Sequence, residues 1–272
     1  MKKVHAVYFS GTGTTKKTVN FIAEKLSKKL NLQKEIFDFT LPNTRKEVKE
    51  FDIQDIVIFG VPVVAGRVPN VLLKYLDTIR GNGALVIPIV LFGNRDFNDA
   101  LMELSDILKK DNFKVIGAAA FVGEHSFSKI LAKGRPDEKD MKKMEMFVEN
   151  IYEKISKKEF NSDIPIEITH GERPFKYYKP RDNQGNYIDI RKVIPKTKKE
   201  LCDNCKVCSL VCPMGSIDYE NPEKIIGICI KCGACIKKCH VDAKYFDDEG
   251  YLYHKKDLEE RYKRRAEPEL FY

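Results

Sequence analysis

The cysteines are the feature that most constrains this chain, because all eight of them fall in one short stretch of its 272 residues. They form two runs with one spacing, C-x2-C-x2-C-x3-C, and the second run repeats the first after 27 residues. Eight cysteines are too few for a disulfide scaffold over this length. The sequence therefore predicts two related metal-binding halves, whose ligands are Cys202, Cys205, Cys208, Cys212, Cys229, Cys232, Cys235 and Cys239.

The spacing favours iron–sulfur clusters over zinc. Three cysteines at two-residue intervals suit a compact loop around one face of a [4Fe–4S] cluster, with each thiolate directed at a different iron. A tetrahedral zinc site takes four ligands, usually as two separated pairs, and leaves no use for a third regularly spaced cysteine in each run. We therefore expect two [4Fe–4S] clusters.

Residues 200–247 resemble the bacterial two-cluster ferredoxins, in the two cysteine runs and in Pro213 after the first of them. In those proteins the fourth cysteine of a run ligates the other cluster. The resemblance departs at His240, where proline is usual after the second run; a surface histidine and a residue that tunes a cluster both stay open. The implied ligand sets are crossed: Cys202, Cys205, Cys208 and Cys239 for one cluster, and Cys229, Cys232, Cys235 and Cys212 for the other.

The first 160 residues alternate strand and helix patterns. Short apolar runs alternate with segments whose apolar residues recur three and four positions apart, as in amphipathic helices. This alternation predicts an α/β fold, a doubly wound sheet of five parallel strands with helices on both faces. The expected strands are Lys3–Phe9, Gln33–Phe39, Ile56–Gly60, Ala84–Phe92 and Lys114–Phe121.

A loop of glycines and hydroxyl residues follows the first strand. It is not a Walker A loop, since glycine is absent at position 16, and it lacks the third glycine of a Rossmann fingerprint. Its backbone N–H groups, at the start of a helix, are expected to form an anion site to which hydroxyls add donors for a terminal phosphate. The loop comprises Ser10, Gly11, Thr12, Gly13, Thr14 and Thr15.

Residues 1–160 resemble a flavodoxin, because the loop carries hydroxyls at Ser10, Thr12 and Thr15. The resemblance implies FMN, with its isoalloxazine ring between two further loops that follow strands, 61–67 and 93–97. The implied ring contacts are Pro62, Val63, Val64, Ala65 and Gly66 from the first loop, and Gly93, Asn94, Arg95 and Phe97 from the second.

Several side chains near the implied ring leave alternatives open. The chain has no tryptophan to stack on a flavin, and Phe97 either stacks on the ring or packs in the core. Arg67 and Arg95 either raise the flavin potential as nearby cations or are ordinary solvated residues. His125 either donates a hydrogen bond in the crevice or stabilises its own loop.

The patterns and the two resemblances together predict four segments. Residues 1–160 form the flavodoxin-like FMN-binding domain, and residues 161–200 a proline-interrupted connector. Residues 201–250 form a small α+β two-cluster ferredoxin domain. Residues 251–272 form a charged tail, helical over 255–265, that ends in apolar residues expected to dock on the rest of the chain.

The expected function is electron transfer between the clusters and FMN. The alternative is an enzyme that reduces a small acceptor such as a quinone, an oxygen species, a nitro compound or a disulfide; no catalytic residue is assigned. The net charge of +8 is scattered along helices, which favours acidic redox-protein partners over nucleic acid. No apolar stretch reaches the about 20 residues of a membrane span, and we find no signal peptide. We expect a cytoplasmic protein and leave a homodimer open.

Overall fold

Five parallel strands form the centre of the molecule, in a computed structural model that describes residues 2–159 and 166–272. The strand order is β2-β1-β3-β4-β6, which is the flavodoxin-like form of the doubly wound sheet. The predicted boundary between residues 160 and 161 lies outside the described residues. The strands are β1 (Lys3–Tyr8), β2 (Gln33–Asp38), β3 (Ile56–Pro62), β4 (Leu85–Phe92) and β6 (Ala118–Val122).

The sheet has seven strands rather than the five expected. The predicted fifth strand is broken into β5 (Lys114–Val115) and β6, which both pair with β4. Gly117 lies at the break, where a Cβ would clash with the Ile151 side chain. The chain ends in β9 (Glu269–Phe271), which pairs antiparallel with β6 at the sheet edge. The end of the C-terminal tail is therefore part of the sheet.

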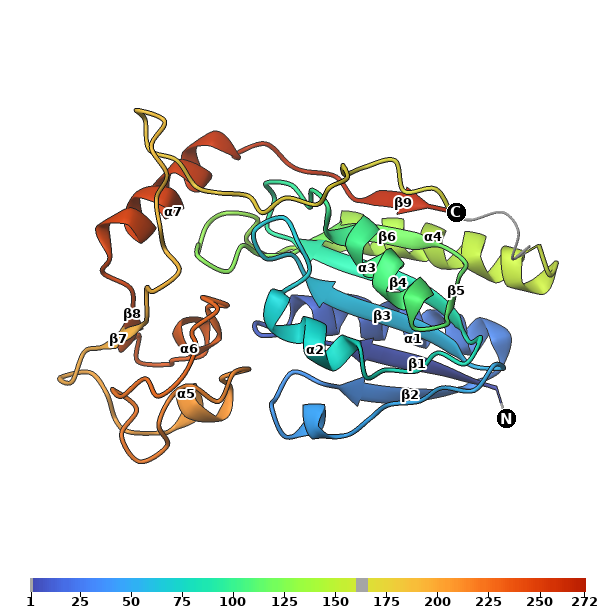
Figure 1. Cartoon of the computed structure of the whole chain (residues 1–272), viewed down its shortest axis with the longest axis horizontal. Helices are drawn as coiled ribbons and strands as arrows, with labels where there is room; N and C mark the ends of the chain where they lie inside the picture. Colours follow the sequence, from blue (N-terminus) through green and yellow to red (C-terminus); the bar gives the residue numbers. More distant parts are fainter. Residues whose placement is uncertain (1, 160–165) are drawn as a thin grey trace.

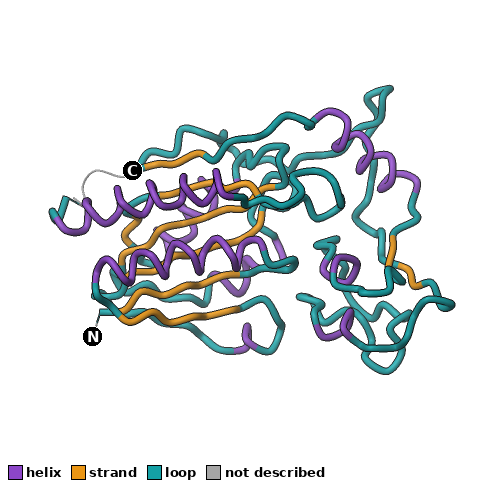
Figure 2. The backbone as a smooth tube through the Cα atoms, turned by 180° about the vertical axis from the view of Figure 1, so that it is seen from behind, coloured by secondary structure: helices purple, strands orange, loops and turns teal. Residues whose placement is uncertain are grey.

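Helices cover both faces of the sheet. On one face α1 (Thr14–Leu30) and α4 (Glu138–Ser156) lie side by side, as Figure 2 shows. The core beneath them includes Val19 and Met144. The other face is covered by α3 (Ala100–Lys110) and by a short 3-10 turn, Asn70–Leu72, that continues into α2 (Leu73–Leu76).

The remaining residues return across the carboxyl ends of the strands. Residues 196–246, which we call the cysteine module, lie beyond those ends (Figure 1). From the module, α7 (Glu249–Arg261) leads back toward β9. No helix in the described part of the chain has the length and apolarity to cross a membrane. The module elements are β7 (Lys196–Thr197), α5 (Val207–Leu210), α6 (Ala234–Lys237) and β8 (Lys244–Tyr245).

Candidate functional site

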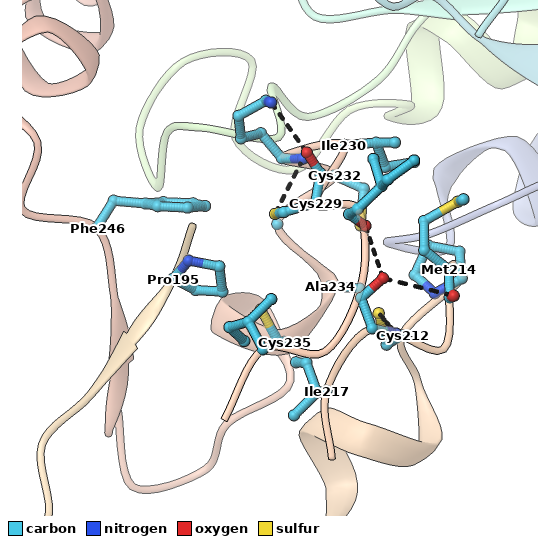
Figure 3. Close-up of a pocket in the computed structure, with 16 residues that line it drawn as sticks. Pro195, Cys212, Met214, Ile217, Cys229, Ile230, Cys232, Ala234, Cys235 and Phe246 are labelled. Atoms are coloured by element: carbon cyan, nitrogen blue, oxygen red, sulfur yellow. Dashed lines mark hydrogen bonds between the residues drawn. The ribbon is translucent and has the colours of Figure 1, made fainter. Parts of the chain in front are cut away.

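An apolar pocket in the cysteine module is lined by cysteines of both runs (Figure 3). Cys212 comes from the first run, and Cys229, Cys232 and Cys235 come from the second. These four are one of the two crossed ligand sets expected from the sequence. The rest of the lining is largely apolar and includes Met214, Ile217, Ile225, Ile228, Ile230 and Phe246.

Burial keeps the Cys232 and Cys235 thiols of this set neutral when no metal is bound. Burial raises the pKa of Cys232 to about 11, and the nearby thiols of Cys212 and Cys229 add to the effect. The pKa of Cys235 is raised further, again by burial first and then by neighbouring cysteines. A cluster of four thiols in which the pKa values of Cys229, Cys232 and Cys235 are raised needs a cation to hold them as thiolates. The donor set therefore fits a metal or an iron–sulfur cluster.

Cysteines of the other set lie nearer the surface. Burial raises the pKa of Cys208, and Cys202 contributes to the same effect. Cys205 is exposed, with its Sγ 4.0 Å from Nδ1 of His240. His240 is also exposed, and its Nε2 lies 2.9 Å from a carboxylate oxygen of Asp203. The structure thus places His240 at the solvent-facing side of the first run.

The backbone repeats along with the cysteines. Left-handed residues precede α5 and α6 at matching positions, Lys206 (φ 65°) and Gly233 (φ 74°). The last cysteine of each run accepts a hydrogen bond from the N–H four residues later, at 3.3 Å for Cys212 and 3.2 Å for Cys239. Such N–H donors stabilise negative charge on sulfur. The two runs therefore form two copies of one structural half.

The loop 10–15 has the features of a phosphate site. Gly13 caps α1 with φ 106°, the first turn of α1 carries no acidic residue, and no atom lies within 4 Å of a Cβ built on Gly13. Ser10 Oγ accepts a hydrogen bond from the Lys16 N–H at 3.0 Å. Among the described residues, the N–H groups of 11–15 donate no hydrogen bond. Free donors at the positive end of a helix fit the phosphate of FMN.

The loop 61–67 is held by the connector rather than left open. Ala65 and Gly66 both have left-handed backbones, and the Ala65 carbonyl accepts a hydrogen bond from the Tyr178 N–H at 2.8 Å. Arg67 forms a bidentate ion pair with Glu103, which is 5% exposed. Arg67 is therefore neither a free cation beside the ring nor a solvated surface residue.

The loop 93–97 is covered by the C-terminal tail and the connector. Asn94 is buried, and its side-chain amide donates to the carbonyls of Tyr262 and Arg264 while its oxygen accepts from the Ala266 N–H. The Arg95 guanidinium lies 3.9 Å from the centroid of the Tyr178 ring. The side chains of this loop thus hold other segments in place.

Phe97 belongs to the core and does not face the crevice. It is 1% exposed and packs on Phe92, with ring centroids 5.5 Å apart. Its other neighbour is His170 of the connector, whose ring stacks on it at 3.9 Å. The sequence left open whether Phe97 stacks on the flavin ring or packs in the core, and the structure shows that it packs in the core.

His125 lies in the loop after β6 and supports that loop. Its Nδ1 accepts a hydrogen bond from the Phe127 N–H at 3.1 Å, and its ring occupies the space above Gly93. Burial lowers the pKa of His125 to about 3, with a further contribution from His254. The ring is therefore neutral at physiological pH, as a loop-stabilising histidine would be.

The sequence did not reveal that the module packs directly against the phosphate loop. A Cβ built on Gly11 would lie 3.2 Å from the Cβ of Cys232 and 3.4 Å from its Sγ. A Cβ on Gly233 would clash with the carbonyl oxygen of Ser126, in the loop after β6. Arg45 donates to the Pro213 carbonyl at 2.6 Å. The second cysteine run therefore packs against the phosphate loop and the loop after β6.

No protein-family model matches the chain, and no curated protein matches it. Solved structures that match include an archaeal flavodoxin, with 16% identity over 57% of this chain and 99% of that one and a TM-score of 0.39. Flavodoxin 2 from Bacillus cereus gives 16% identity over 56% and 99%, with a TM-score of 0.44.

A further match is the rubredoxin oxygen:oxidoreductase of Desulfovibrio gigas, with 16% identity over 58% of this chain and 36% of that one and a TM-score of 0.41. Likenesses of this strength add nothing to what the strand order already shows. The α/β domain is flavodoxin-like in fold.

Proposed function

We propose that the chain is an electron-transfer protein that binds FMN at the crevice and two [4Fe–4S] clusters in the cysteine module. The observation that carries the proposal is the contact between Gly11 and Cys232, because it gives the expected phosphate site and one expected cluster site a common wall. When bound, FMN exchanges one or two electrons and each cluster exchanges one, so the cofactors together couple the two kinds of electron carrier.

In this proposal the phosphate loop binds and orients the cofactor. The N–H groups of 11–15, which have no acceptor among the described residues, and the hydroxyls of Ser10, Thr12 and Thr15 hold the phosphate. The main chain of loops 61–67 and 93–97 borders the ring, while the side chains of Arg67, Asn94 and Phe97 fix those loops from behind. Arg67 is the one positive side chain of these three, and its ion pair with Glu103 neutralises the charge that could otherwise raise the flavin potential.

The cysteines hold the clusters in the crossed arrangement. Cys212 joins the second run because all four thiols line one pocket, which leaves Cys239 to complete the set of Cys202, Cys205 and Cys208. The reduced thiols that such ligands require persist in the cytoplasm, where we place the protein.

The partners in this proposal are redox proteins with acidic docking surfaces. The chain carries a net charge of +8, which steers proteins of opposite charge toward it. We prefer this carrier role to a reductase of small acceptors. Both ring loops are braced by other segments of the chain, through the Ala65 carbonyl that accepts from the connector and the Asn94 side chain that is bonded to the tail.

Anaerobic purification followed by iron, sulfide and flavin analysis tests the proposal. We expect about eight irons, about eight sulfides and about one FMN per chain, as two [4Fe–4S] clusters and one flavin require. Zinc in place of iron, or a chain that stays colourless after anaerobic reconstitution, would contradict the cluster half. A chain with full iron and no affinity for FMN would contradict the flavin half.

A further inference from the structure

The two cysteine runs are copies of one half, yet they lie in different surroundings. The second cysteine of the first run, Cys205, is exposed and borders Asp203 and His240. The matching cysteine of the second run, Cys232, is partly buried and lies against Gly11 of the phosphate loop. The second cysteine of the first run thus faces solvent, whereas the second cysteine of the second run faces the phosphate loop.

The next residue along shows how this difference is built into the sequence. Lys206 and Gly233 occupy matching positions and have nearly the same backbone, with φ 65° and 74°. A left-handed backbone disfavours lysine but does not exclude it, so the repeat itself tolerates a side chain there. At Gly233 a side chain is excluded because a Cβ would clash with the Ser126 carbonyl. The glycine is therefore required by the packing of the second run on the α/β domain.

A third matched pair, Leu210 and Lys237, shows the same difference between the two halves. Leu210 ends α5 and is 59% exposed. Its counterpart in α6 is Lys237, whose Nζ lies 3.2 Å from a carboxylate oxygen of Glu124 in the loop after β6. The face that is exposed in the first half is thus bonded to the α/β domain in the second half.

We infer that the second run is the one that exchanges electrons with the FMN crevice, and that Gly11 and Gly233 are positioning residues that hold it there. The inference rests on the proposed function and deepens it by assigning different roles to the two halves. Each transfer moves one electron from the site of Cys212, Cys229, Cys232 and Cys235 to the crevice. Two transfers, with protons from water, complete the reduction of FMN, and a one-electron reductant such as reduced methyl viologen resupplies the module.

The test compares Gly233→Lys with Lys206→Gly in the fully loaded protein. Each change gives one half of the repeat the residue that the other half has. After a pulse of reduced methyl viologen, flavin absorbance reports the internal transfer. We expect Gly233→Lys to slow it at least severalfold, because the rate of electron tunnelling falls exponentially as the second run is displaced from the crevice. Lys206→Gly should leave the rate unchanged.

A structural readout accompanies the kinetics. Hydrogen exchange of residues 123–128 reports whether the second run still packs on the loop after β6. We expect protection there to fall in Gly233→Lys and to persist in Lys206→Gly. Equal behaviour of the two variants in both measurements would overturn the inference.

A charge reversal gives a second route that leaves both glycines in place. Lys237→Glu sets two carboxylates against each other and is expected to slow the transfer. Adding Glu124→Lys restores opposite charges and should recover much of the rate, which a merely damaged module would not do. Leu210→Glu, at the matching exposed position, is the control and should have no effect. Loss of rate without recovery in the double variant would contradict the assignment.

Failure of the inference is distinguishable from failure of the proposed function. If the unaltered chain holds no iron–sulfur cluster or no FMN, the proposed function fails before any variant is compared. If the unaltered chain is fully loaded and Lys206→Gly slows the transfer as much as Gly233→Lys does, only the assignment of roles to the two halves fails.

Discussion

The α/β domain and the cysteine module are stabilised in different ways. Every residue of β6 is buried, and two continuous apolar layers fill the space between the sheet and its helices. The buried apolar cluster at the module is small: it consists of Phe246 together with Val193 and Tyr251, which lie just outside the module. Apolar side chains such as Leu210 and Ile228 are exposed there. The comparison indicates that the first region folds by burying apolar surface. On the proposed function, the second region is expected to depend on metal–thiolate bonds.

Removal of the clusters should produce the largest difference in stability between the two regions. We expect anaerobic chelation to unfold residues 196–246 and to leave the sheet folded, because ligand binding and folding are one process in small metal domains. Hydrogen exchange measures both regions in one sample. Loss of protection in β4 together with the module, or full protection in a metal-free module, would contradict the account.

Truncation of a core side chain should destabilise the α/β domain. Phe121 is fully buried against Phe147, with ring centroids 6.2 Å apart, so Phe121→Ala is expected to lower the free energy of unfolding of the α/β domain by about 3–5 kcal/mol. Denaturant titration measures this loss. Ile36→Ala, at a side chain that is 55% exposed, should change it by less than about 1 kcal/mol. Similar losses in both variants would show that Phe121 is not packed as described.

The phosphate loop should respond to the loss of one hydroxyl. A hydrogen bond to a charged group contributes about 1.5–3 kcal/mol, so Thr12→Val is expected to weaken FMN binding by about tenfold or more. Flavin fluorescence titration of the cluster-loaded chain measures the affinity. Thr18→Val is the matched control, since Thr18 is buried in α1 with a hydroxyl that has no partner among the described residues. Equal affinities for the two variants would count against the phosphate site.

A smaller, pH-dependent effect is expected at Asp111. Burial raises the pKa of Asp111 to about 6, and Asp77 adds to the shift. The unfolded chain therefore releases this proton at lower pH than the folded chain does, and the group costs stability as the pH rises from about 4 to about 6. Asp111→Asn should remove this fall and be more stable than the unaltered chain at neutral pH. Urea titrations across this range measure it, and an unchanged slope would contradict the assignment.

Much of the sheet could be predicted from sequence because its signals are local. Periodicity marks β1, β3 and β4, and the glycines and hydroxyls of 10–15 mark a turn into a helix whatever the rest of the chain does. The methionines of α4 also follow a local pattern. These features depend on residues a few positions apart, which a single sequence displays.

The side chains around the ring loops could not be predicted, because their partners are distant and carry no periodic pattern. Asn94 binds carbonyls of the tail about 170 residues away, Arg67 pairs with Glu103, and Phe97 stacks on His170. The strand β9 was missed because three residues are too few for a pattern. One of the long-range contacts did leave a signal in the sequence. Glycine at position 233, where the matching position 206 has lysine, marks the packing of the second run on the loop after β6.

A crystal structure of the FMN-loaded protein, measured at the iron absorption edge, tests the central claim most directly. Two iron sites are expected, one of them among Cys212, Cys229, Cys232 and Cys235, with the flavin phosphate over Gly13 on the other side of Gly11. An iron site enclosed by the first run alone, or a flavin bound away from the second run, would contradict the account.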